Sequence, residues 1–128
     1  MRTRKHSLLR LILGLATCWT PVGVFGQGSS EGTITGTVAD PSGAPIPSAQ
    51  ITLRNNQTNS VRELKTGSTG VYTIPNLPVG TYELTAGAAG FQNLQVKDIK
   101  LDVNATRRVD VNLNVGQVSE TVTVESTA

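Results

Sequence analysis

Residues 33–54 read TITGTVADPSGAPIPSAQITLR and hold two short alternating runs on either side of a turn. In the first run Ile34, Gly36 and Val38 fall on one face of an extended strand, and threonines fall on the other. The turn at residues 40–43 is Asp-Pro-Ser-Gly, in which proline fixes φ and glycine tolerates a positive φ. The second run alternates in the same way. One buried and one solvated face predict antiparallel β-structure.

The same alternation recurs along the chain at the spacing that is typical of a β-sandwich, and no segment has helical periodicity. We therefore predict an all-β fold, a seven-stranded antiparallel Greek-key sandwich over residues 32–116. Strands are expected near residues 33–39, 49–54, 60–66, 70–74, 81–86, 94–103 and 109–115. The expected core consists of Ile34, Val38, Ile51, Leu53, Tyr72, Ile74, Tyr82, Leu84, Val109, Val111 and Leu113.

Three segments depart from simple alternation. The run at residues 60–66 is weakly patterned and charged, which favours a short or irregular edge strand. Residues 75–80 contain two prolines and predict a stiff connector with Leu77 directed into the core. In the sixth strand the apolar residues change phase at Lys97-Asp98, which predicts a β-bulge there.

Residues 1–26 have the pattern of a secretion signal, with basic residues at the start followed by an apolar run. Small residues before Gln27 predict signal cleavage between Gly26 and Gln27. The apolar run at residues 11–19 is shorter than the roughly 20 residues that a membrane-spanning helix needs, which argues against a retained anchor. Cys18 leaves lipid attachment as an alternative, although Thr17 and Trp19 fit that signal poorly. We therefore expect export.

Removal of this leader changes the composition. The whole chain carries +2, whereas residues 27–128 hold seven basic residues against nine acids and carry −2. Cys, His, Met and Trp all fall within the leader. The remaining 102 residues therefore lack the side chains for thiol or Ser-His catalysis, for disulfides and for His or Cys metal ligands. They also lack a basic patch for nucleic acid and a membrane-spanning segment.

Two longer motifs extend through residues 34–51 and 66–91. The first is Ile34-x-Gly36-x-Val38-x-Asp40-x-x-Gly43-Ala44-Pro45-Ile46-Pro47-x-Ala49-x-Ile51. The second begins Thr66-x-x-x-Gly70-x-Tyr72-x-Ile74 and continues Leu77-x-x-Gly80-Thr81-Tyr82-x-Leu84-x-Ala86-x-x-x-Gly90-Phe91. Both motifs resemble carboxypeptidase regulatory-like domains. The resemblance implies a transthyretin-like, carbohydrate-binding-like β-sandwich. Ser68 departs from the aspartate that many relatives carry in this turn, and we expect no functional consequence.

The stretch Leu113-Asn114-Val115-Gly116-Gln117-Val118-Ser119-Glu120-Thr121-Val122-Thr123-Val124 resembles the junction after this domain in Oar-like TonB-dependent receptors. A plug and a barrel follow there, and residues 117–128 are too short to contain either. The resemblance implies an N-terminal extension domain without its transporter, either as a short relative or as a piece of a longer receptor. It implies location in the periplasm or at the outer membrane of a Gram-negative bacterium.

Candidate sites are few, and we expect no catalytic residues, cofactor or metal. Asp40, Asp98, Asp102 and Asp110 lack the spacing of a calcium loop. Relatives of this fold bind glycans through exposed aromatic rings, and Phe91 is the only candidate contact of that kind, so a carbohydrate-binding module is the alternative function.

The tail at residues 117–128 alternates valine and threonine. It is expected to pair with its own domain, to stay a linker, or to pair with envelope proteins through a sheet edge. We expect a non-enzymatic accessory or interaction module.

Overall fold

The computed structural model describes residues 23, 26, 28, 30–117 and 121–126 of the 128-residue chain. Most of the expected signal peptide, including Cys18, lies outside these residues. Of the two residues that flank the predicted cleavage position, Gly26 is among the described residues and is exposed, whereas Gln27 lies outside them. Among the described residues no helix is long and apolar enough to cross a membrane.

All regular secondary structure in the described residues is β-strand, which confirms the all-β sandwich. The described residues form nine strands rather than seven, because residues 106–108 form a strand that the sequence did not predict and the tail forms another. Of the predicted last strand at residues 109–115, only residues 111–112 form a strand. The strands are β1 (Glu31–Ala39), β2 (Gln50–Asn55), β3 (Val61–Lys65), β4 (Val71–Pro78), β5 (Gly80–Gly87), β6 (Asn93–Leu101), β7 (Thr106–Arg108), β8 (Val111–Asn112) and β9 (Thr121–Glu125).

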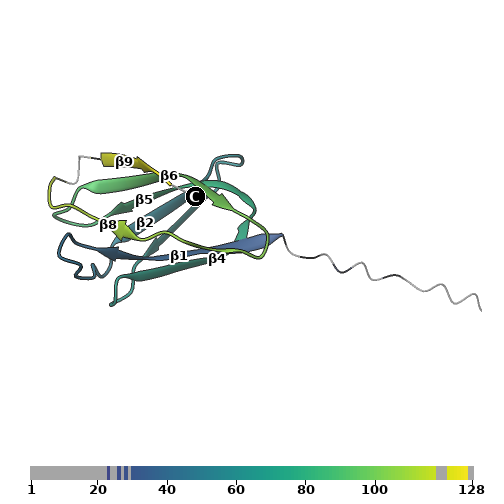
Figure 1. The fold of residues 1–128 in the computed structure, drawn as a ribbon, viewed down its shortest axis with the longest axis horizontal. Helices are drawn as coiled ribbons and strands as arrows, with labels where there is room; N and C mark the ends of the chain where they lie inside the picture. The colour runs from purple at the N-terminus through teal and green to yellow at the C-terminus, as the bar shows by residue number, and fades with distance from the viewer. Residues whose placement is uncertain (1–22, 24–25, 27, 29, 118–120, 127–128) are drawn as a thin grey trace, which may run out of the picture.

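The strands form two sheets that face each other (Figure 1). One sheet has the order β4-β1-β7, with β8 also paired to β1, and the other has the order β3-β2-β5-β6-β9. β3 is an edge strand, as its charged sequence predicts.

The prediction that the sheets are antiparallel throughout is wrong, because β7 and β8 run parallel to β1 and β9 runs parallel to β6. The turn after β6 explains the direction of β7. The Asn104 N–H donates to the Glu31 carbonyl at 2.9 Å, so the chain arrives at the beginning of β1 and then follows it. The same turn leaves Val103 54% exposed, although its parity matched that of the buried residues Ile99 and Leu101.

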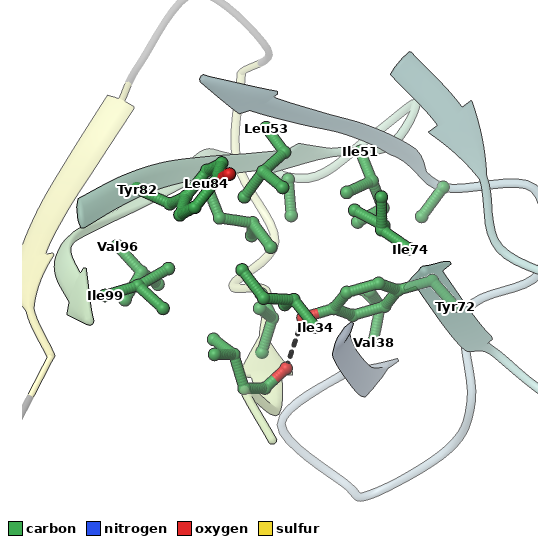
Figure 2. Close-up of a cluster of buried hydrophobic side chains, with 14 of the residues drawn as sticks. Ile34, Val38, Ile51, Leu53, Tyr72, Ile74, Tyr82, Leu84, Val96 and Ile99 are labelled. Carbon is green, nitrogen blue, oxygen red and sulfur yellow. Dashed lines mark hydrogen bonds between the residues drawn. The ribbon is translucent and has the colours of Figure 1, made fainter. Parts of the chain in front are cut away.

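The core lies between the two sheets, and Figure 2 shows side chains from both meeting there. Each of the eleven residues expected in the core is at most 8% exposed. Apolar side chains at alternate positions account for this, because successive residues of a strand point to opposite faces. The structure also buries Ile46, Ala49, Leu77, Ala86, Val96, Ile99 and Leu101.

The predicted connector at residues 75–80 is wrong, because β4 continues through Pro78 and Leu77 pairs with Gly32. β4 is the edge strand of its sheet, and an edge tolerates proline because one side of its backbone needs no ladder hydrogen bond. Leu77 is only 1% exposed, so the segment supplies the expected core residue while remaining part of the sheet.

The predicted bulge in β6 is confirmed. Tyr82 pairs with Ile99 and Leu84 pairs with Val96, so β6 holds one extra residue between these two pairs. Asp98 has a φ of 57° at this position. The extra residue lets Val96 and Ile99 face the same core although their spacing in sequence is odd.

The predicted strand at residues 109–115 begins later than expected, because Val109 and Asp110 lie between β7 and β8 and belong to neither. Asp110 Oδ1 accepts hydrogen bonds from the Thr37 N–H at 2.9 Å and from the Thr37 hydroxyl at 3.0 Å, so a side chain replaces a backbone rung. The buried Tyr72 hydroxyl donates to the Val109 carbonyl and is drawn with its dashed hydrogen bond in Figure 2.

Gly36 lies between Tyr72 and Val109. It pairs with Tyr72 across β1 and β4, and a Cβ at Gly36 would lie 1.9 Å from the Val109 carbonyl oxygen and 2.8 Å from the Tyr72 hydroxyl. Only a residue without a side chain therefore permits the tyrosine to reach across β1.

We predict that Gly36→Ala lowers the free energy of unfolding by at least about 2 kcal/mol, because backbone atoms must move to admit the methyl group. Gly67→Ala is the matched control, because the nearest atom to its added Cβ is the Val71 carbonyl oxygen at 3.9 Å. Chemical denaturation monitored by circular dichroism measures the free energy of unfolding of both variants. Equal effects of the two substitutions would contradict the role of Gly36.

A second prediction concerns alkaline pH. Burial raises the pKa of Tyr72, the charge of Asp110 raises it further, and the neutral ring is favoured in the folded protein. The unfolded tyrosine titrates near pH 10, so the stability that the neutral ring contributes is present below about pH 10 and is lost as the pH rises toward the folded pKa.

Tyr72→Phe should be less stable than the wild type at pH 8 by about 1–3 kcal/mol, because the Val109 carbonyl loses its partner. Above pH 10 the difference in free energy of unfolding between the wild type and Tyr72→Phe should decrease by up to about 1.4 kcal/mol per pH unit. Urea denaturation of both proteins at pH 8 to 11.5 tests this expectation, since other titrating groups are common to the two. A difference that stays constant with pH would contradict it.

Candidate interaction edge and polar cavity

The edges of the two sheets differ in chemistry. β3 carries Arg62, Glu63 and Lys65 in its five residues, and β4 contains Pro75 and Pro78. Charges and prolines are two devices that keep edge strands from pairing with other chains. These edges are therefore poor sites for strand addition.

β9 differs from both because its sequence is Thr-Val-Thr-Val-Glu, with one charge and no proline. It pairs with β6 in parallel, with Val122 opposite Leu94 and Val124 opposite Val96. The Thr123 hydroxyl donates to Gln95 Oε1 at 3.2 Å. Pairing of the tail with its own domain, one of the expected alternatives, is thus what the structure contains, while pairing with envelope proteins stays a prediction.

The backbone of β9 has one side toward β6 and one side away from it. The Ser126 N–H donates to the Lys97 carbonyl at 2.8 Å. Backbone groups alternate in direction along a strand, so those of Val122 and Val124 also face β6. The N–H and carbonyl groups of Thr121, Thr123 and Glu125 face away from β6, where no strand among the described residues pairs with them.

The valines of β9 extend the apolar face of the sheet. Val122 and Val124 share their face with Leu94 and Val96, which pack in or against the core. Each of these two valines is nevertheless 41% exposed, since β9 lies at the edge of its sheet. Within the part of the chain that the structure describes, the edge of β9 therefore combines backbone groups that no strand pairs with and a strip of partly exposed apolar surface.

A cavity of about 410 Å³ lies beside the C-terminal end of β9. The Arg107 guanidinium of β7 donates to Ser126 Oγ at 3.2 Å and so links the two sheets at this position. The lining carries two cations, two carboxylates and two hydroxyl groups, from Thr81, Asp98, Lys100, Arg107, Glu125 and Ser126. Such a surface offers hydrogen-bond donors and acceptors to a polar ligand.

Phe91, the candidate glycan contact, forms an isolated bridge with Val115 and is partly buried against the core. It is not among the residues that line the polar cavity. Tyr72 and Tyr82 are each 2% exposed, and both serve as core residues.

The aspartates are engaged in local structure. Asp40 caps its own turn, and the hydrogen bond from the Ser42 hydroxyl lowers the pKa of the Asp40 carboxyl. The Arg108 guanidinium lies 2.9 Å from Asp110, and this hydrogen bond lowers the pKa of the Asp110 carboxyl. Within the described part of the chain, no group of three or more His, Cys, Asp or Glu side chains is placed to hold a metal ion.

Sequence reasoning missed the polar cavity, because its residues come from strands up to 45 positions apart and share no motif. The available signal for the edge was the valine-threonine alternation after Gly116, which predicted β-structure without indicating which strand it would join.

The fold and its edges define a small β-sandwich module. Residues 33–114 match the model of the carboxypeptidase regulatory-like domain family, which is a non-catalytic regulatory or binding β-sandwich. The chain belongs to this family. No curated protein sequence matches the chain.

Several solved structures share the fold. The TIE protein of Bacillus anthracis matches with a TM-score of 0.57 and 17% identity, over 67% of this chain and 17% of that chain. A catechol 1,2-dioxygenase from Acinetobacter matches with a TM-score of 0.58 and 12% identity, over 81% of this chain and 60% of that chain. A candidate carbohydrate-binding protein from Bacteroides uniformis matches with a TM-score of 0.55 and 20% identity, over 66% of this chain and 41% of that chain.

This chain spans less than two thirds of the length of each of these three proteins. At these identities the likeness concerns the fold alone.

Proposed function

We propose that the chain is an exported, non-enzymatic interaction module of the bacterial cell envelope, located in the periplasm or at the outer membrane of a Gram-negative bacterium. The open edge of β9 is the observation that carries this proposal. An extended segment of an envelope protein can add to such an edge by backbone hydrogen bonds, while pockets for alternate side chains select the partner.

Two features of the sequence support the location. The leader at residues 1–26 has the pattern of a secretion signal, and residues 113–124 resemble the junction found in Oar-like TonB-dependent receptors. The module then corresponds to the N-terminal extension of such a receptor, either as a short relative or as one part of a longer protein.

Expression in a Gram-negative host should place the protein in the periplasmic or outer-membrane fraction, with a mature N-terminus at Gln27. Intact mass measures the processing, because lipid attachment at Cys18 would add mass that Cys18→Ala removes. Gly26→Leu is the control, since a bulky residue before the cleavage position should retain the leader. Full-length protein confined to the cytoplasm would contradict the proposal.

The polar cavity supports a second candidate function, carbohydrate binding. Its carboxylates, cations and hydroxyl groups match the hydrogen-bonding groups of a sugar, and its volume of about 410 Å³ accommodates a small ligand. One protein that shares the fold is described as a candidate carbohydrate-binding protein.

If this second candidate is correct, isothermal titration should detect a sugar at millimolar concentration, and Arg107→Gln should weaken binding by about tenfold through loss of a charged hydrogen bond. Arg54→Gln is the matched control, because Arg54 lies on β2 and pairs with Glu83 rather than lining the cavity. Absence of heat for a panel of neutral and acidic sugars would remove this candidate.

A further inference from the structure

The outward side of β9 is complementary to itself. Thr121, Thr123 and Glu125 direct their backbone groups away from β6. When two such strands meet antiparallel about a two-fold axis at Thr123, each Thr123 faces its own copy and each Thr121 faces Glu125 of the other copy. All three outward-facing residues then become hydrogen-bonded pairs.

The side chains fit this register as well. Val122 of one copy faces Val124 of the other in the closely spaced, non-hydrogen-bonded pairs, where apolar side chains make the most contact. Both valines are 41% exposed in the single chain, and mutual pairing covers them. No like charges meet, because Glu125 is the only charged residue of β9 and lies opposite threonine.

We propose that β9 is a self-association site, at which a second copy of this chain adds its own β9 antiparallel and joins the two five-stranded sheets into one continuous sheet. The interface is isologous, since the same residues contribute from both copies. This inference rests on the proposed function and deepens it by naming the partner that the edge accepts.

A second copy fits better than an arbitrary extended peptide because the match involves both hydrogen bonds and side chains. A peptide satisfies the backbone of any open edge, whereas the apolar strip also requires valine-sized residues at two alternate positions. β9 carries these residues at the spacing that its own edge demands.

Sedimentation of the purified full chain over a range of concentrations tests the proposal. The average mass should rise from monomer toward dimer in the micromolar to millimolar range, as expected for a small interface. Thr123→Pro should abolish the dimer, because it removes an outward N–H that β6 does not use. Thr123→Val is the matched control, since it keeps that N–H while losing the hydroxyl bond to Gln95, and it should still dimerise.

Charge at position 121 tests the register. Thr121→Lys places a cation opposite Glu125 of the second copy and should tighten the dimer by about 2- to 30-fold over its two symmetric pairs. Thr121→Glu places like charges there and should weaken the dimer by a similar factor. Arg62→Glu, on the exposed β3 edge, is the control and should leave self-association unchanged.

A chain that remains monomeric at every concentration overturns the self-association proposal, as does a dimer that is indifferent to Thr123→Pro or to the sign of the charge at position 121. A monomer that still reaches the envelope fraction leaves the proposed function standing. A dimer with the expected responses in a protein confined to the cytoplasm supports self-association and refutes the proposed function.

Discussion

The hydrogen bond from the Tyr72 hydroxyl to the Val109 carbonyl ties together three segments of one sheet. The ring starts on β4 and passes over β1, which is possible only because Gly36 has no side chain at the crossing. The neighbouring Asp110 then takes the Thr37 N–H, so the segment after β6 stays attached to β1 despite its interruption. Tyr72 and Val109 are both buried in the core, so this arrangement contributes to the inner face on which the second sheet packs.

Much of the fold was predictable because strands alternate with a period of two. That rule places Ile34 and Leu84 in the core, and one break in the rule located the bulge in β6. The alternation does not predict whether two neighbouring strands run parallel or antiparallel. The parallel direction of β7 is therefore explained only by the hydrogen bond between Asn104 and Glu31 in the structure. The alternation also treats Asp110 as one more outward residue, whereas its carboxylate replaces part of a ladder.

The candidate site was harder to predict from the sequence than the fold. The composition of the tail indicated a strand, but its docking on β6 depends on which edge is vacant, and that is a property of the assembled sheets. The polar cavity follows from this docking, since Glu125 and Ser126 form part of its wall. The sequence offered Phe91 as the candidate glycan contact, and its packing against the core is likewise set by tertiary contacts.

The bulge at Asp98 adjoins the pairing of β6 with β9. The pairing of β9 with β6 is described as far as Lys97 and Glu125, and the next residue of β6 is Asp98, which has a positive φ. Beyond this point β6 still contributes Ile99 to the core. The extra residue therefore lets one strand meet two demands, because β6 pairs with β9 up to Lys97 and still directs Ile99 into the core.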